Sequence, residues 1–278
     1  GLEWTHKRHQ VDFSLLTLDQ IINQAAKWFY MFDGKINVPL VIRLIVGRGW
    51  GQGPQHSQSL HSFFSHIPGL KVVMPSTSES VGPLMEAAIK DPNPVIFIEH
   101  RWLHSLKSNN KVKNKIKELG KAEILKKGKD ITIVSCSYMT IEVLRISEFL
   151  KKNKIDFELV DLQSISPLDY KTILNSVKKT KRLLVLDIGH KTFGISAEII
   201  SIVSEKLITK MKYRPQRIAL PDIPTPTTFV LAKDYYPSKY DITKKIFTMC
   251  GLKRKLPKNT FGDDLYKDQP FKEFTGPF

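Results

Sequence analysis

The stretch RLIVGRGWGQGPQHSQSLHSFFSHIPG, residues 43–69, decides the fold class of this chain. Its apolar start is typical of a buried strand, which runs into a loop with alternate glycines, Gly47, Gly49, Gly51 and Gly53. Glycines gather where a backbone needs a positive φ or approaches another group closely. The loop ends at His56, a residue type that titrates near neutral pH and transfers protons. We therefore expect a strand, a ligand-facing loop, and a short helix over residues 57–66 with His56 at its start.

Strand and helix patterns alternate on both sides of this stretch. The expected strands are residues 38–45, 70–74, 95–99, 130–136, 157–162, 182–187 and 217–220. The expected helices are residues 18–32, 57–66, 79–90, 140–153, 168–178 and 194–210. Such alternation predicts an α/β protein whose mainly parallel sheets are covered by crossover helices.

A change of composition divides the alternation into two three-layer domains. Lysines and asparagines dominate the region after residue 105, where apolar periodicity fades. We expect a first domain over residues 1–106, a linker over 107–122 and a second domain over 123–250. Residues 251–278 show no periodicity and are expected to form a tail of unknown role.

The composition is that of a globular protein, with 278 residues of which 41% are hydrophobic. No apolar run reaches the roughly 18 residues of a membrane span. The two cysteines, Cys136 and Cys250, fit a reducing cytoplasm. The formal charge of +16 is spread along the chain without a nucleic-acid-binding signature, so an acidic partner subunit or anionic substrates are better expectations. The polar start at Gly1 leads us to expect a true N-terminus further upstream.

Few residues stand out as candidates for chemistry. His56 has polar neighbours, and its spacing alone leaves a catalytic and a packing role equally open. His190 follows a strand end and suits an ordinary corner better than a ligand-facing turn. The glycine loop lacks the Gly-Lys-Ser/Thr of a phosphate loop and the spacing of a dinucleotide fingerprint. Asp91 and Asn93 could line a cation site with backbone carbonyls, although an ordinary turn explains their spacing better.

Several longer motifs together resemble a known family. DQIINQAAKWFYM, the loop ending in QHSQSL, IPGLKVVMPST and AAIKDPNPVIFIEH resemble beta subunits of thiamine-diphosphate-dependent 2-oxoacid dehydrogenases of the pyruvate, acetoin and branched-chain types. GKDITIVSCSYM, VDLQSISPLD and LPDIPTPTT resemble the transketolase C-terminal domain. The resemblance covers roughly residues 11–247. It implies part of a pyrimidine-binding domain followed by a transketolase C-terminal-like domain.

The resemblance also implies an activity and its partners. These enzymes decarboxylate a small 2-oxo acid and pass the acyl unit to an acceptor, usually a lipoyl group. The expected assembly holds two alpha and two beta subunits, and a lipoyl acyltransferase core is a further expected partner. The alpha subunit is expected to hold the diphosphate and its magnesium, while the beta subunit supplies the pyrimidine side of thiamine diphosphate.

Particular residues match positions of functional residues in the family. Phe13 matches the aromatic residue that lies against the aminopyrimidine, and His56 matches the active-site histidine. A structural potassium site is implied by matching backbone oxygens, those of Leu40, Ala88, Ile89, Asp91 and Asn93.

One departure from the family keeps alternatives open. The family's glutamate that pairs with the pyrimidine ring would lie upstream of Gly1, so we expect it on a missing segment or on another polypeptide. One alternative is a transketolase-like or deoxyxylulose-type synthase, in which His56, His61, His100 and Arg48 would surround an anionic sugar. The other is a truncated, non-catalytic scaffold subunit.

Overall fold

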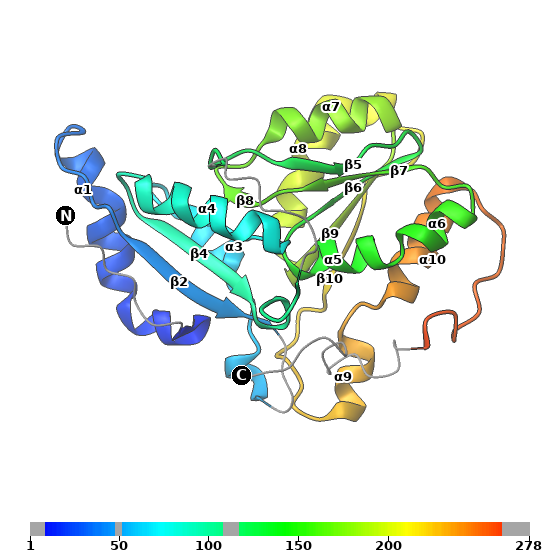
Figure 1. Cartoon of the computed structure of the whole chain (residues 1–278), viewed down its shortest axis with the longest axis horizontal. Coiled ribbons are helices and arrows are strands. Elements are labelled where there is room, and N and C mark those ends of the chain that lie inside the picture. The colour runs from blue at the N-terminus through cyan, green and yellow to red at the C-terminus, as the bar shows by residue number, and fades with distance from the viewer. Residues whose placement is uncertain (1–8, 48–51, 108–116, 263–278) are drawn as a thin grey trace.

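The computed structural model describes residues 9–47, 52–107 and 117–262 of the chain. Two α/β units lie side by side, each built on a five-stranded sheet (Figure 1). This confirms the expected fold class of two α/β domains with mostly parallel sheets. None of the helices within the described ranges is long and apolar enough to span a membrane.

The first sheet has the order β1-β2-β4-β3-β8. Its strands are His9–Gln10 (β1), Val41–Val46 (β2), Val95–His100 (β4), Lys71–Val73 (β3) and Ser164–Ser166 (β8). The first four are parallel, and β4 is buried along its whole length, as expected of a central strand covered on both faces. Strand β8 pairs antiparallel with β3 although it comes from the second half of the chain. The sequence pattern did not predict this strand.

The N-terminal helical region differs from the single helix expected over residues 18–32. It consists of a 3-10 helix at Val11–Thr17, a π-helix at Asp19–Ala25 and α1 at Ala26–Met31. Each π-type bond spans five residues instead of four, so the side chains rotate out of the 3.6-residue period. This explains why Phe29, which would share a face with Leu18 and Ile22 in a regular helix over residues 18–32, is 43% exposed. Ala26 in α1 lies against the turn at Gly69, where φ is +98°.

The helix expected over residues 57–66 is shorter in the structure, and a second short helix precedes it in the glycine loop. They are α2 at Gly53–His56 and α3 at His61–Ser65. His56 therefore ends a helix rather than beginning one. Within α3, Phe63 is exposed while His61 is fully buried.

Helix α4 connects β3 to β4 and covers Ser78–Lys90. Its N-cap is Thr77, whose side chain forms a capping box with Ser80. Ser76 donates its hydroxyl to Asp161 across the domain boundary, at 2.5 Å.

The second sheet has the order β10-β9-β6-β7-β5, with only β5 antiparallel. Its strands are Gln216–Leu220 (β10), Leu183–His190 (β9), Ile131–Ser135 (β6), Phe157–Asp161 (β7) and Glu123–Lys126 (β5). The helices on it are Tyr138–Arg145 (α5), Ser147–Lys152 (α6), Tyr170–Thr180 (α7) and Ile195–Leu207 (α8), the last extended by a 3-10 turn at Ile208–Lys210. In Figure 1, α7 and α8 cover one face of the sheet, and α5 covers the other.

Two details of this unit correct the sequence expectation. The helix expected to begin at Thr140 begins earlier, after Ser137, so Thr140 lies within α5. Its hydroxyl is buried and donates to Asp161 at 3.0 Å. Ser166-Pro167 does not open a helix, since α7 begins only at Tyr170.

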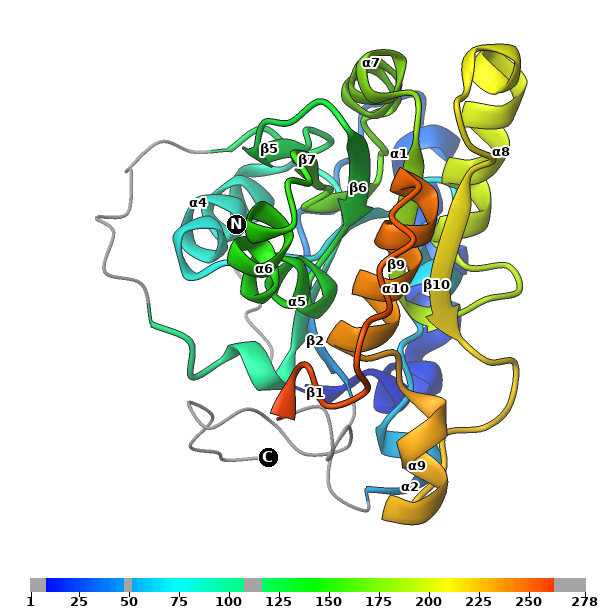
Figure 2. The ribbon, with the colours of Figure 1, turned by 90° about the vertical axis from the view of Figure 1, so that its right-hand side faces the viewer.

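The chain after the second sheet adds two helices. Helix α9 covers Phe229–Tyr235, and α10, which the sequence pattern did not predict, covers Lys239–Cys250. Beyond α10 the chain runs back along that helix (Figure 2). The ring of Phe261 lies 5.2 Å from that of Phe149, so the first part of the expected tail closes the core. Residues 263–278 lie outside the described ranges.

Candidate functional site

The fold brings Phe13 and His56 together from distant parts of the sequence. Phe13 comes from the 3-10 helix after β1, and His56 ends α2. Their ring centroids are 5.4 Å apart with an interplanar angle of 33°. Phe13 is 49% exposed, so about half of its surface is accessible to a ligand.

His56 has a carboxylate partner that no sequence motif marked. Its Nδ1 lies 2.9 Å from Asp12 Oδ2, and the side chains are 39% and 12% exposed, respectively. An ionised carboxylate only accepts hydrogen bonds, so Nδ1 carries the proton in the neutral imidazole. Nε2 then keeps its lone pair and can accept a proton and return it. The only sequence signal for Asp12 is its position next to Phe13.

Arg101 is a second residue that the motifs did not mark. It follows β4 in a 3-10 turn at Arg101–Leu103, and only 2% of it is exposed. Its Nη1 donates to Gln52 Oε1, and its Nη2 donates to the backbone oxygen of His56 at 3.0 Å. Burial lowers the pKa of Arg101, while the charges of Asp12 and Tyr236 oppose this shift.

The start of the glycine loop packs tightly on His100. A Cβ on Gly47 would lie 2.5 Å from His100 Nε2, and φ at Gly47 is +113°, so this position requires glycine. The His100 ring stacks on Tyr138, with centroids 4.8 Å apart. Arg48, Gly49 and Gly51 lie outside the described residues.

His61 serves the contact between the two domains. Its Nε2 lies 2.9 Å from Asp187 Oδ1, at the end of β9. The backbone amides of Gly189 and Ser196 also donate to Asp187. Burial alone would raise the pKa of Asp187, but His61 and these donors hold it below its ordinary value. His61 is completely buried and already paired, which weighs against the expected sugar-binding role.

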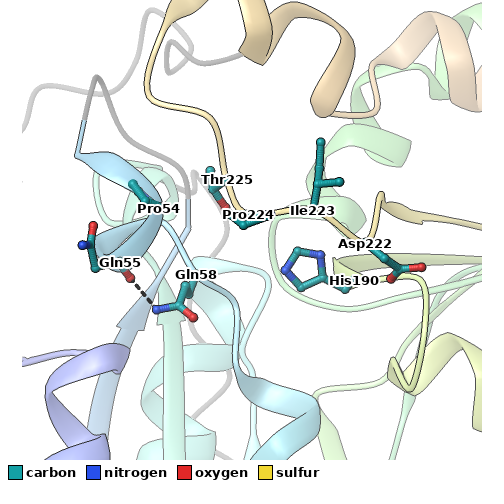
Figure 3. Close-up of a pocket in the computed structure, with 8 residues that line it drawn as sticks. All are labelled: Pro54, Gln55, Gln58, His190, Asp222, Ile223, Pro224 and Thr225. Atoms are coloured by element: carbon teal, nitrogen blue, oxygen red, sulfur yellow. Dashed lines mark hydrogen bonds between the residues drawn. The ribbon is translucent and has the colours of Figure 1, made fainter.

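A pocket of about 530 Å³ lies between α2 and the segment after β10 (Figure 3). Its lining residues are Pro54, Gln55, Gln58, His190, Asp222, Ile223, Pro224 and Thr225. His190 Nδ1 lies 2.8 Å from the backbone oxygen of Pro221, which ties the ring to the end of β10. Gln58 donates to the backbone oxygen of Gln55 at 2.9 Å, so the α2 wall of the pocket is also held in place.

The residues expected at a potassium site gather around the turn between α4 and β4. The oxygen of Leu40 accepts from Val95 N at 2.9 Å, and that of Ala88 accepts from Asp91 N at 3.3 Å. Asn93 N donates to Asp91 Oδ1 at 3.0 Å, whereas Asn93 Oδ1 is buried without a hydrogen-bond partner. Hard cations bind oxygen ligands, which the backbone of this turn and Asn93 Oδ1 offer, although Lys71 Nζ already pairs with the Asp91 carboxylate. Over the described ranges, His, Cys, Asp and Glu form no cluster of three that could hold a metal.

Two family models match the chain. The model "Transketolase, pyrimidine binding domain" matches residues 10–105, and "Transketolase, C-terminal domain" matches residues 120–242. Among solved structures, the chain resembles a split-gene transketolase, described as an inactive beta4 tetramer, with a TM-score of 0.71. That match has 19% identity and covers 89% of this chain and 76% of the other, so it supports the fold alone.

Curated relatives are much closer in sequence. The beta subunit of acetoin:2,6-dichlorophenolindophenol oxidoreductase from Cupriavidus necator is 40% identical over 232 residues, which are 84% of this chain and 69% of the relative. The mitochondrial pyruvate dehydrogenase E1 component subunit beta-1 of Oryza sativa is 40% identical over 86% of this chain and 65% of the relative. The corresponding Rickettsia bellii subunit is 37% identical over 87% and 74%.

The match therefore spans about two thirds of the length of these relatives and includes both domains. The two family models match the two halves of the chain that carry the two sheets. The chain belongs to the transketolase-like family of beta subunits of thiamine-diphosphate-dependent 2-oxoacid dehydrogenases.

Proposed function

We propose that this chain supplies the pyrimidine-facing half of an active site that decarboxylates a small 2-oxo acid. The observation that carries the proposal is the placement of Phe13 beside His56, with Asp12 on Nδ1 of the imidazole. A half-exposed aromatic ring next to an acid–base group suits a flat heteroaromatic cofactor, so these residues fit thiamine diphosphate.

Each residue has a separate task in this proposal. Thiamine diphosphate, when bound, supplies the carbon nucleophile for the 2-oxo group and the electron sink for decarboxylation. Phe13 packs on the pyrimidine ring and excludes water from that face. His56 holds a proton at Nε2 or accepts one there, first beside the substrate oxygen and later beside the acyl acceptor. The usual acceptor in this family is a lipoyl group carried by an acyltransferase core.

An alpha subunit is the proposed partner, and an exposed apolar surface supports it. The N-terminal helical region exposes Leu16 by 85%, Tyr30 by 88% and Met31 by 65%. Several large exposed apolar side chains in one region are typical of a protein interface. We assign the diphosphate and magnesium to the alpha subunit and expect two copies of each subunit in the assembly.

The potassium site and the domain limits also belong to the proposal. Potassium would be held by the oxygens of the turn between α4 and β4, where Asn93 Oδ1 lacks a partner. The two domains would cover residues 1–106 and 123–250, joined by a linker over 107–122. Strand β8 extends the first sheet from within the second domain, so the two domains are interlocked.

The proposal is tested by purifying the chain from its host with the alpha subunit and assaying 2-oxo acids for thiamine-dependent decarboxylation and lipoyl transfer. His56→Gln is expected to slow acyl transfer by about 10²- to 10⁴-fold, the range of general acid–base catalysis. His66→Gln is the control, because His66 is an exposed histidine at the end of α3. Unchanged transfer in His56→Gln would contradict the assignment. An inactive but intact complex would favour the scaffold alternative, and activity only with a sugar acceptor would favour the synthase.

A further inference from the structure

We propose that Asp12 and Arg101 are positioning residues that hold His56 in one tautomer and one place. Asp12 acts on the imidazole, and Arg101 acts on the backbone of α2. The inference rests on the proposed function only in assuming that His56 moves a proton, because the contacts themselves lie within this chain.

Asp12 is held firmly enough to orient a ring. The preceding residue, Val11, is 1% exposed in the core, and Ser14 Oγ donates to the oxygen of Val11 at 2.5 Å. This anchors the turn that carries Asp12. Asp12 Oδ1 is buried without a hydrogen-bond partner among the described residues. The carboxylate therefore makes its side-chain hydrogen bond through Oδ2, which lies 2.9 Å from Nδ1 of His56.

The contact selects one of the two neutral tautomers of His56. A carboxylate accepts from Nδ1–H and thereby leaves Nε2 unprotonated. Nε2 is the nitrogen away from Asp12, so it is the one available to substrate and acceptor. Without the carboxylate, the neutral ring could carry its proton at Nε2 instead. The unprotonated nitrogen would then be Nδ1, which points away from the substrate.

Arg101 supports the same histidine from the backbone side. Helix α2 has four residues, and its N-cap Gln52 makes no side-chain capping bond. Helices this short are not stable alone, because nucleation fixes several residues for one hydrogen bond. The two Nη groups of Arg101 reach Gln52 at one end and the oxygen of His56 at the other, so one guanidinium spans the whole helix. Lysine cannot reproduce this fork.

The contacts form a closed ring between distant segments. Gln10 Nε2 donates to Gln52 Oε1 at 3.4 Å, and Gln10 lies two residues before Asp12. The ring therefore runs from β1 through Gln52 and Arg101 to His56 and back to Asp12. The side-chain contact of His56 with Asp12 and its backbone contact with Arg101 are therefore both connected to β1, at the edge of the first sheet. We treat the two contacts as acting together on His56.

The tautomer is measured directly in the chain without cofactor, by ¹⁵N NMR of histidine-labelled protein at a pH where imidazoles are neutral. The His56 signals are assigned with His56→Gln. We expect the Nδ1–H form in the wild type and the Nε2–H form in Asp12→Ala. Asp19→Ala removes an exposed carboxylate that bonds only Asn23 among the described residues, so it should leave His56 unchanged. A wild-type His56 in the Nε2–H form, or an unchanged spectrum in Asp12→Ala, would overturn the inference.

Two further variants guard against misfolding. Asp12→Asn keeps the shape of the side chain, and its amide can present either oxygen or nitrogen to Nδ1, so a mixture of tautomers is expected. Arg101→Lys keeps the charge but loses the fork, and we expect kcat of the holoenzyme to fall about 10²-fold with KM for the 2-oxo acid within twofold. An unchanged kcat in Arg101→Lys would overturn its positioning role. If Asp12→Ala changes the tautomer but acyl transfer stays normal, positioning stands and the proposed role of His56 fails.

Discussion

The imidazole of His61 and the carboxylate of Asp187 are fully buried and lie 2.9 Å apart, from Nε2 to Oδ1, at the contact between the two domains. His61 belongs to α3, and Asp187 lies in β9 of the second sheet. The pair links the segment that follows the glycine loop to the second domain. Its loss would therefore affect both the stability of the fold and the placement of the candidate site.

His61→Ala is expected to destabilise the chain by about 3–5 kcal/mol, because it leaves the carboxylate of Asp187 buried without the side-chain partner of Oδ1. Urea unfolding measures this change, with His66→Ala as the exposed control. The Asp187 pKa is held below its ordinary value, so the contribution of the pair is present above the unfolded pKa of about 3.9 and disappears as the pH falls through the folded value. A decrease in the free energy of unfolding of less than about 1 kcal/mol would contradict this prediction, because breaking a buried pair usually costs more.

The contribution of Asp161 to stability should depend on pH in the opposite direction to that of Asp187. Burial raises its pKa to about 6, although Ser76 and Thr140 donate to it. The folded state therefore binds the proton more tightly than the unfolded chain does. The associated stability is present below the unfolded pKa and decreases as the pH rises through about 6, by an amount on the order of 3 kcal/mol. Asp161→Asn should remove this pH dependence in unfolding curves between pH 4 and 7, while the exposed control Asp19→Asn should preserve it. An identical pH profile in Asp161→Asn would contradict the assignment.

We expect a side chain at Gly69 to destabilise the fold strongly. A Cβ there would lie 1.8 Å from the backbone oxygen of Ala26, and φ is +98°. Gly69→Ala must push α1 away from the turn and is expected to cost about 3 kcal/mol or more in the free energy of unfolding. Gly82→Ala is the matched control, because nothing lies within 4 Å of its Cβ and alanine favours its helix. Equal stabilities of the two variants would contradict the packing of α1 on this turn.

The proposed potassium site predicts ion-dependent stability. The melting temperature should rise in KCl relative to choline chloride at equal ionic strength, because a cation that binds only the folded state stabilises it. Asn93→Ala removes the unpartnered amide oxygen and should reduce the potassium effect. The exposed Asn23→Ala should keep it. Equal melting in both salts would exclude a stabilising potassium site.

The apolar N-terminal surface predicts where the alpha subunit binds. The double variant Leu16→Asp, Tyr30→Asp should weaken co-purification of the alpha subunit, because each substitution replaces an exposed apolar side chain of the proposed interface by a charged one. Phe193→Asp is the control, because Phe193 is 93% exposed in the second domain. Undiminished co-purification of the double variant would place the alpha subunit elsewhere.

Local patterns predicted the sheets better than the helices. Buried strands such as β4 and β6 are continuous apolar runs, and these need no knowledge of partners. The helix predicted over residues 57–66 is shorter in the structure, where α3 covers His61–Ser65, and the one-turn helix α2 at Gly53–His56 was not predicted because four residues carry too little periodicity. Strand β8 was not predicted, since three residues carry too little pattern and its pairing with β3 depends on the docked domains.

The sequence by itself determined the two α/β units, the family resemblance, and the choice of Phe13 and His56. These depend on apolar periodicity and on motifs that are contiguous in the chain. Only the tertiary structure decided that Asp12 and Arg101 contact His56, and that His61 is buried against Asp187. The reason is physical: the charge partner of a buried or oriented side chain is selected by folding, which brings residues 44 to 126 positions apart into contact.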